Sequence, residues 1–151
     1  MSRGLQADFI PHAPAGELAR GVTRLFGDLG QASLAELPLG NGRRVDVIAL
    51  DRGGRLTVVE IKTTAADYRS DRKWQEYVPY CDAFYFAVPE DFDRALLPDG
   101  VGVMVADSWS AAILTASPEF RLAPARRKAV TLRFARAAAQ RLMRLDQPAF
   151  P

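Results

Sequence analysis

The sequence has few of the residues that cross-link a chain or bind soft metal ions. Its 151 residues include one cysteine, Cys81, and one histidine, His12. A single cysteine cannot form an internal disulfide, and this pair cannot supply the four ligands of a structural zinc site. We therefore expect neither a disulfide scaffold nor zinc chemistry.

Long apolar runs are also missing. No run approaches the roughly 20 residues that cross a bilayer. Residues 1–14 lack the basic stretch and the long apolar segment of a secretion signal. We therefore expect a cytoplasmic protein with no membrane partner, and we expect no organic cofactor.

The composition is typical of one globular domain. The chain is 48% hydrophobic, and a domain of this length buries about two-thirds of its unfolded surface. We expect a single domain over residues 1–151. The net charge of +2 is too small to indicate a nucleic-acid partner when it is taken over the whole chain.

Hydrophobic periodicity and turn residues predict an α/β fold. Helices are expected at 14–26, 70–77 and 125–145, and strands at 33–39, 44–50, 56–63, 83–88, 102–106 and 111–115. The first three strands form a meander, and Pro38 confines the first of them to an edge. Both faces of the next two strands are apolar, so we expect helices above and below a central sheet. For the last helix we expect a packing face of Val130, Phe134, Ala138, Leu142 and Leu145.

Three charged residues, Asp46, Glu60 and Lys62, interrupt the two strands that look most buried. Burying an isolated charge is costly, so such groups persist mainly when they are paired or bind a metal. The residues therefore leave two readings open. One is a structural ion-pair cluster at a strand end, and the other is a functional site.

The loop between these strands decides whether the three side chains meet. In an antiparallel pair, directly opposed residues share a face. A three-residue loop at 52–54 places Asp46 opposite Glu60, with all three side chains together. A two-residue turn at Gly53 and Gly54 would place Asp46 opposite Ile61, pointing away. A functional site therefore requires an odd loop or a bulge.

Two adjacent carboxylates suit a hard cation such as Mg²⁺ or Mn²⁺. The backbone carbonyl of Ile61 is a further candidate ligand. Lys62 could orient or deprotonate a water molecule, or neutralise developing charge, and the sequence does not choose between these roles.

These residues resemble the PD-(D/E)XK nuclease superfamily. The resemblance rests on Val45-Asp46, a spacer of thirteen residues and Glu60-Ile61-Lys62, with a helix before them and a strand after them. Residues 43–88, which include Lys73-Trp74, look more closely like the MmcB family of DNA-repair proteins. The sequence departs from the superfamily motif at Val45, where the motif name has proline.

The resemblance implies a restriction-endonuclease-like fold, with a central mixed sheet between helices, and magnesium-dependent cleavage of DNA during repair. Asp46 and Glu60 match the metal-binding acids, and Lys62 matches the motif lysine. Glu17 is a candidate for the extra acid of some members, and Lys73 or Gln75 for a polar residue on the second helix. The alternative is a DNA- or protein-binding module that keeps the fold without catalysis.

The C-terminal part of the chain is strongly basic. Residues 121–151 hold eight basic residues and one acid, a local charge of +7. Arg126, Arg127 and Lys128 cluster at the start of the expected last helix and are candidates for binding DNA phosphates. An ordinary solvated face explains the same charges equally well. The sequence also leaves open whether two copies form a homodimer.

Overall fold

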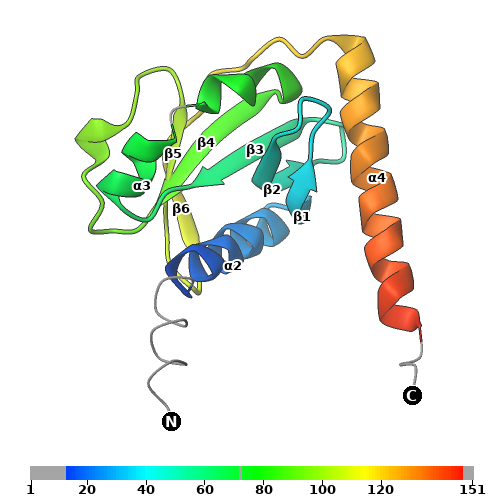
Figure 1. Cartoon of the computed structure of the whole chain (residues 1–151), viewed down its shortest axis with the longest axis horizontal. Coiled ribbons are helices and arrows are strands. Elements are labelled where there is room, and N and C mark those ends of the chain that lie inside the picture. The colour runs from blue at the N-terminus through cyan, green and yellow to red at the C-terminus, as the bar shows by residue number, and fades with distance from the viewer. Residues whose placement is uncertain (1–12, 72, 148–151) are drawn as a thin grey trace.

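The computed structural model describes residues 13–71 and 73–147. It is a mixed α/β fold with one six-stranded sheet and helices around it (Figure 1). The elements are α2 (Ala13–Asp28), β1 (Ala32–Pro38), β2 (Arg44–Leu50), β3 (Leu56–Ile61), α3 (Ala65–Ser70), η1 (Trp74–Glu76), η2 (Val78–Tyr80), β4 (Ala83–Val88), η3 (Arg94–Leu96), β5 (Gly102–Ala106), β6 (Ala111–Thr115) and α4 (Pro124–Asp146). His12 lies outside the described residues.

The strands follow one another across the sheet in chain order. β1, β2 and β3 are antiparallel neighbours. β4 and β5 continue in parallel with β3, and β6 closes the sheet antiparallel to β5. The predicted meander and the edge position of Pro38 are therefore confirmed.

Helices cover both faces of the sheet, as the apolar character of β2 and β3 predicts. α2 packs Leu18, Val22 and Phe26 on one face. Aromatic residues fill the other face, where Tyr77 stacks on Phe84 with ring centroids 6.2 Å apart. Cys81 is fully buried in this second core, and burial raises the pKa of its thiol to about 12.

The second helix lies earlier than predicted, so the prediction of a helix at 70–77 is wrong. Thr64 caps the N-terminus of α3 by accepting a hydrogen bond from the Asp67 N–H at 3.0 Å. This cap starts the helix at Ala65, and α3 ends at Ser70. Residues 74–80 form two short 3₁₀ helices, with Pro79 in the first turn of η2, where the N–H that proline lacks is not needed.

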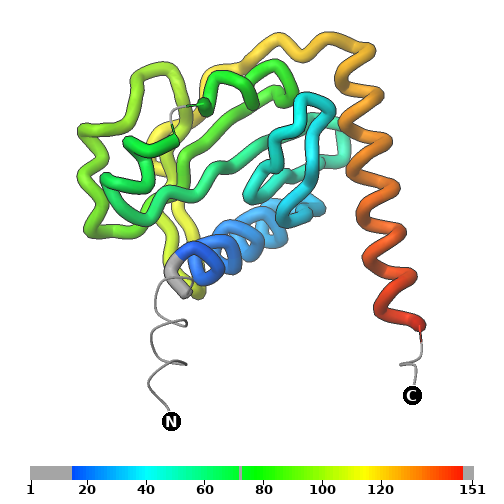
Figure 2. The backbone as a smooth tube through the Cα atoms, viewed as in Figure 1, coloured from blue at the N-terminus to red at the C-terminus, as the bar shows by residue number. Residues whose placement is uncertain are grey.

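The predicted packing face of the last helix is only partly correct. Val130 and Phe134 are buried, but Leu142 and Leu145 are 60% and 82% exposed. α4 contacts β1 and η2, and its C-terminal part runs on past them (Figures 1 and 2). Apolar spacing along the helix does not reveal which of these side chains face the sheet. Among the helices in the described residues, none has the length and apolar character needed to cross a membrane.

Candidate functional site

The loop between β2 and β3 sets the register of the site. The Asp51 N–H donates to the Arg55 carbonyl at 3.0 Å, and the Asp51 carboxylate accepts from the N–H groups of Gly53 and Arg55 at 2.8 Å each. Three residues therefore lie between the opposed positions 51 and 55. Regular pairing runs from Leu50–Leu56 to Val47–Val59. The next opposed positions are Asp46 and Glu60, as the three-residue loop predicts.

The two carboxylates lie between the strands where regular pairing stops. The Asp46 N–H donates to Glu60 Oε1 at 3.2 Å, and the Ile61 N–H donates to Asp46 Oδ2 at 2.8 Å. Each side chain thus accepts a main-chain hydrogen bond from the other strand. These contacts fix both carboxylates with little freedom to turn away.

Lys62 joins Asp46 and Glu60 in the lining of one pocket of about 520 Å³. Its side chain is only 6% exposed, and its Nζ lies 3.4 Å from Asp71 Oδ2. The Lys62 N–H donates to the Ala87 carbonyl at 3.0 Å, which ties this residue to β4. The structure therefore brings the three predicted residues to one place.

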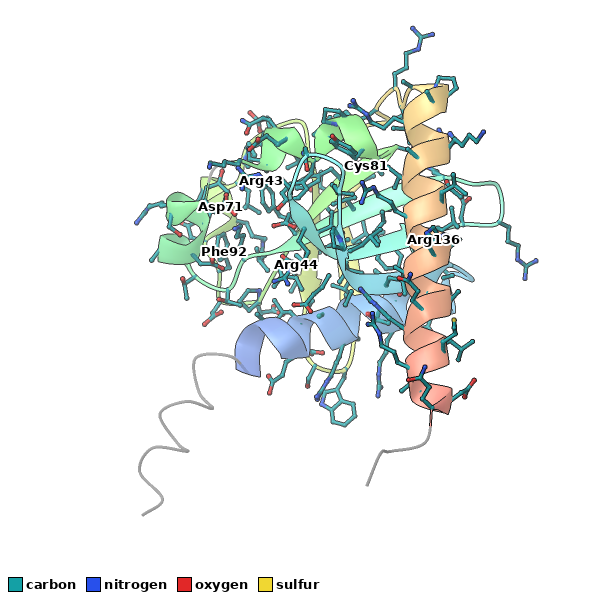
Figure 3. All side chains as sticks on the ribbon, turned by 45° about the vertical axis from the view of Figure 1, so that its right-hand side comes forward. Arg43, Arg44, Asp71, Cys81, Phe92 and Arg136 are labelled. Atoms are coloured by element: carbon teal, nitrogen blue, oxygen red, sulfur yellow. The ribbon has the colours of Figure 1, made fainter. Side chains whose placement is uncertain are left out.

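Several residues of this lining could not be predicted from the sequence. Asp67 on α3 and Asp71 just after it line the pocket, as do Arg44 and Tyr77; Arg44 and Asp71 are labelled in Figure 3. The only sequence signal for the two acids is their position shortly after Lys62. The incorrect prediction of a helix at 70–77 obscured the proximity of these acids to Lys62.

Glu36 on β1 also lines the pocket and has an unusual backbone. Its φ is +56°, a left-handed conformation that costs a non-glycine residue about 1–3 kcal/mol. It lies between the paired positions Ala35–Val47 and Leu37–Val45, beside Asp46. Its carbonyl accepts a hydrogen bond from Arg141 Nη2 at 3.2 Å, which links α4 to the edge of the pocket.

Burial and proximity oppose the simultaneous ionisation of the Asp46 and Glu60 carboxylates. Burial, followed by repulsion from Asp46, raises the pKa of Glu60 to about 8. Burial also raises the pKa of Asp46, although the hydrogen bond from Ile61 and the charge of Lys62 oppose the shift. At neutral pH the pair therefore retains a proton unless a cation compensates the second charge.

The donor set fits a magnesium ion. Within residues 13–71 and 73–147, no group of three or more His, Cys, Asp or Glu side chains is arranged to hold a metal. Magnesium is usually held by one or two carboxylates, with water and substrate phosphates completing its shell. Asp46 and Glu60 supply those carboxylates, and Ile61 lines the same pocket.

The structure does not bring the three accessory candidates into this lining. Glu17 is exposed on α2 and lines a neighbouring pocket of about 830 Å³ with Thr63 and Thr64. Lys73 and Gln75 are exposed and are absent from the lining around Asp46.

Of the three basic candidates on α4, Arg127 has a structural contact. Its Nη1 and Nη2 donate to the Asp82 carboxylate at 2.8 and 2.5 Å, and Nη1 also reaches the Gly54 carbonyl at 2.8 Å. Arg126 lies over the Tyr80 ring, 4.6 Å from its centroid, and Lys128 is exposed. Arg127 therefore anchors α4 to the sheet and is not free to bind a phosphate.

We expect Arg127→Ala to destabilise the fold by about 2 kcal/mol, because it leaves the buried Asp82 without its charged partner. This value is below that of a fully buried pair because the Arg127 side chain is 37% exposed. Urea denaturation at neutral pH measures the loss. The control is Arg126→Ala, which removes only a surface cation–π contact; equal losses in the two variants would contradict the assignment.

The same anchor predicts a pH dependence. Burial alone would raise the pKa of Asp82, but hydrogen bonds from Arg127 and the Leu56 N–H outweigh it and lower the pKa below its ordinary value of 3.8. The stabilisation is therefore present above that value and is lost as the pH falls through the lower, folded-state pKa. Arg127→Ala should flatten this acid limb of the stability curve.

The fold and the pocket together define a mixed α/β protein with two carboxylates and a buried lysine where two central strands separate. The chain matches the family described as DNA repair protein MmcB-like over residues 10–149 and belongs to that family. This membership indicates a role in DNA repair.

A solved structure supports the fold. It is the SPO1766 protein of unknown function from Silicibacter pomeroyi, which is 40% identical and superposes with a TM-score of 0.85. The match covers 91% of this chain and 97% of that one. No protein with a curated description matches the sequence.

Proposed function

We propose that this protein is a metal-dependent DNA nuclease of the PD-(D/E)XK type that hydrolyses phosphodiester bonds during repair. The observation that carries the proposal is the convergence of Asp46, Glu60 and Lys62 on one pocket of about 520 Å³. The element order supports a restriction-endonuclease-like fold, since a helix and a meander precede the site and a parallel strand follows it.

Asp46, Glu60 and the main-chain carbonyl of Ile61 would hold Mg²⁺ or Mn²⁺. An ion at that place would lower the pKa of a water molecule and stabilise charge on the scissile phosphate. The contribution of the protein is positional. The main-chain N–H groups of Asp46 and Ile61 hold the two carboxylates in place, so little reorganisation is needed when a substrate binds.

Lys62 supplies the positive charge of the site. Its side chain is almost fully buried, and Asp71 holds its amine at 3.4 Å. An amine fixed in this way can orient the attacking water or stabilise the charge that develops on the phosphate oxygens. Arg44 is exposed and lines the same pocket, with its Nη2 3.8 Å from Glu36 Oε1. This exposed pair is weak, so a DNA phosphate can replace Glu36 as the partner of the guanidinium.

The experiment compares the wild type with Asp46→Asn in Mg²⁺ and Mn²⁺, on single-stranded, duplex, flapped and junction DNA. We expect metal-stimulated cleavage by the wild type and a loss of at least about 10²-fold in Asp46→Asn, because one ligand of the ion loses its charge. The matched control is Asp28→Asn, which removes an exposed carboxylate at the C-terminal end of α2.

The competing function is a DNA-binding module that keeps the fold without catalysis. It predicts that the wild type retains DNA but does not cleave any of these substrates in either metal. Equal cleavage by the wild type and Asp46→Asn would contradict the nuclease proposal, because the activity would then come from another source.

A further inference from the structure

The outward side of α4 carries an exposed apolar stripe. We call Leu132, Ala135, Ala139 and Leu142 the outer stripe. Leu132 and Leu142 are 53% and 60% exposed, and both alanines are exposed. At 3.6 residues per turn these four positions fall within about 80° of the helix circumference. Val130 and Phe134, which pack inward, lie on another side of the helix.

This apolar side has the spacing of a helix–helix seam. The four positions are separated by three, four and three residues, the alternation that places side chains along one line of contact between two helices. Alanines at the middle allow two helix backbones to approach closely. A solvated helix gains nothing from such a pattern, since exposed apolar side chains are usually scattered.

The outer stripe is also symmetric about position 137. Ala135 and Ala139 lie two residues on either side, Leu132 and Leu142 five, and Lys128 and Asp146 nine. Lys128 and Asp146 are exposed and lie on the same side of the helix as the stripe. A two-fold interface requires such self-complementarity, because residue i of one copy meets residue j of the other and the reverse.

We propose that α4 pairs antiparallel with α4 of a second copy of this chain through the outer stripe. In this pair Leu132 of each copy faces Leu142 of the other, and Ala135 and Ala139 meet at the two-fold axis. Lys128 faces Asp146 at both ends of the contact. Asp146 is the one acid in residues 121–151, which also hold eight basic residues. In the pair it acquires a partner of opposite charge. The proposal does not depend on nuclease activity.

Charge repulsion between the two Arg136 side chains opposes the pairing and limits its strength. Arg136, labelled on α4 in Figure 3, borders the outer stripe and would lie near its own copy. Its long side chain lets the guanidinium reach water, so the repulsion is reduced but not removed. The helices would also meet over only about 27 Å, which buries less than a standard interface of about 1,600 Å². We therefore expect a dimer that dissociates on dilution.

The test is sedimentation equilibrium of the full chain, without DNA or metal, over a range of concentrations. Lys128→Asp and Asp146→Lys each replace two opposite-charge contacts with two like-charge contacts, and each is expected to weaken the dimer about tenfold. Both changes favour the helix dipole, so neither should unfold α4. Arg52→Asp, a charge reversal in an exposed loop, is the matched control and should leave the dimer unchanged.

An equimolar mixture of the two single variants is the decisive sample. Each chain then finds opposite charges at both ends of its partner, so the mixture should associate more tightly than either variant alone. Leu142→Lys should abolish association of the otherwise wild-type chain. A monomeric wild type at every concentration, or a mixture no tighter than its components, would overturn the proposal.

Discussion

Replacing Lys62 with methionine is expected to lower metal-dependent DNA cleavage by about 10²- to 10⁴-fold while metal binding persists. Methionine keeps an unbranched chain of similar length in the buried position but carries no charge. The two carboxylates keep their main-chain hydrogen bonds from the Asp46 and Ile61 N–H groups, so the metal ligands stay in place. Single-turnover cleavage and calorimetric metal titration measure the two effects separately.

Lys73→Met is the matched control, because it removes an exposed lysine from outside the lining of this pocket. It should leave the cleavage rate unchanged. Unaltered cleavage by Lys62→Met would remove the lysine from the mechanism. Loss of metal binding in that variant would show that its role is to support the carboxylates.

Replacing Glu60 with glutamine is expected to stabilise the metal-free protein at pH 8 by an amount on the order of a few kcal/mol. Glutamine keeps an oxygen that can accept the hydrogen bond from the Asp46 N–H. It removes a buried carboxylate that must otherwise ionise beside Asp46. Sites of this kind sacrifice stability for function, so a stabilising substitution at Glu60 distinguishes a ligand from a structural residue.

The pH dependence has a definite sign. The pKa of Glu60 rises from an ordinary value of 4.5 to about 8 in the folded protein. Between these values the folded state keeps a proton that the unfolded state has lost, so stability falls as the pH rises. Thermal melts of the wild type with EDTA should decline from pH 5 to pH 8, whereas those of Glu60→Gln should decline less.

Mg²⁺ should restore the stability that the folded protein loses when Glu60 ionises. A ligand that binds only the folded state raises its stability in proportion to the logarithm of ligand concentration. We expect the wild type to gain thermal stability with Mg²⁺ at pH 8 and Glu60→Gln to gain little. Parallel declines of the two proteins with pH, or equal gains with Mg²⁺, would contradict the role given to Glu60.

The sequence predicts the sheet well because its signals are local. The strands 44–50, 83–88, 102–106 and 111–115 have the predicted bounds, since each is a short apolar run between turn residues. The opposition of Asp46 and Glu60 follows from the three-residue loop, which is one of the two turns that the sequence leaves open. Gly54, with φ of +90°, adopts a conformation that favours glycine, and Asp51 closes the loop around it.

The remaining features depend on contacts between residues of different elements. Arg127 looks like any other arginine of a basic helix, yet it meets Asp82 forty-five residues away. Leu142 continues an apolar period, but its side chain is 60% exposed, although the preceding Arg141 reaches the Glu36 carbonyl of β1. Asp71 reaches Lys62 only because α3 is short and ends at Ser70. These facts follow from the packing of elements, which residue patterns do not encode.

Asp46 and Glu60 are proposed to form a site for a divalent cation, and electron paramagnetic resonance of Mn²⁺ measures binding at that site. The free-ion signal should fall by saturable binding when wild-type protein is added, and Mg²⁺ should restore it by competition. Asp46→Asn should leave the signal unchanged, whereas Asp28→Asn should behave as the wild type. Equal Mn²⁺ binding by the wild type and Asp46→Asn, or no binding by either, would contradict the account.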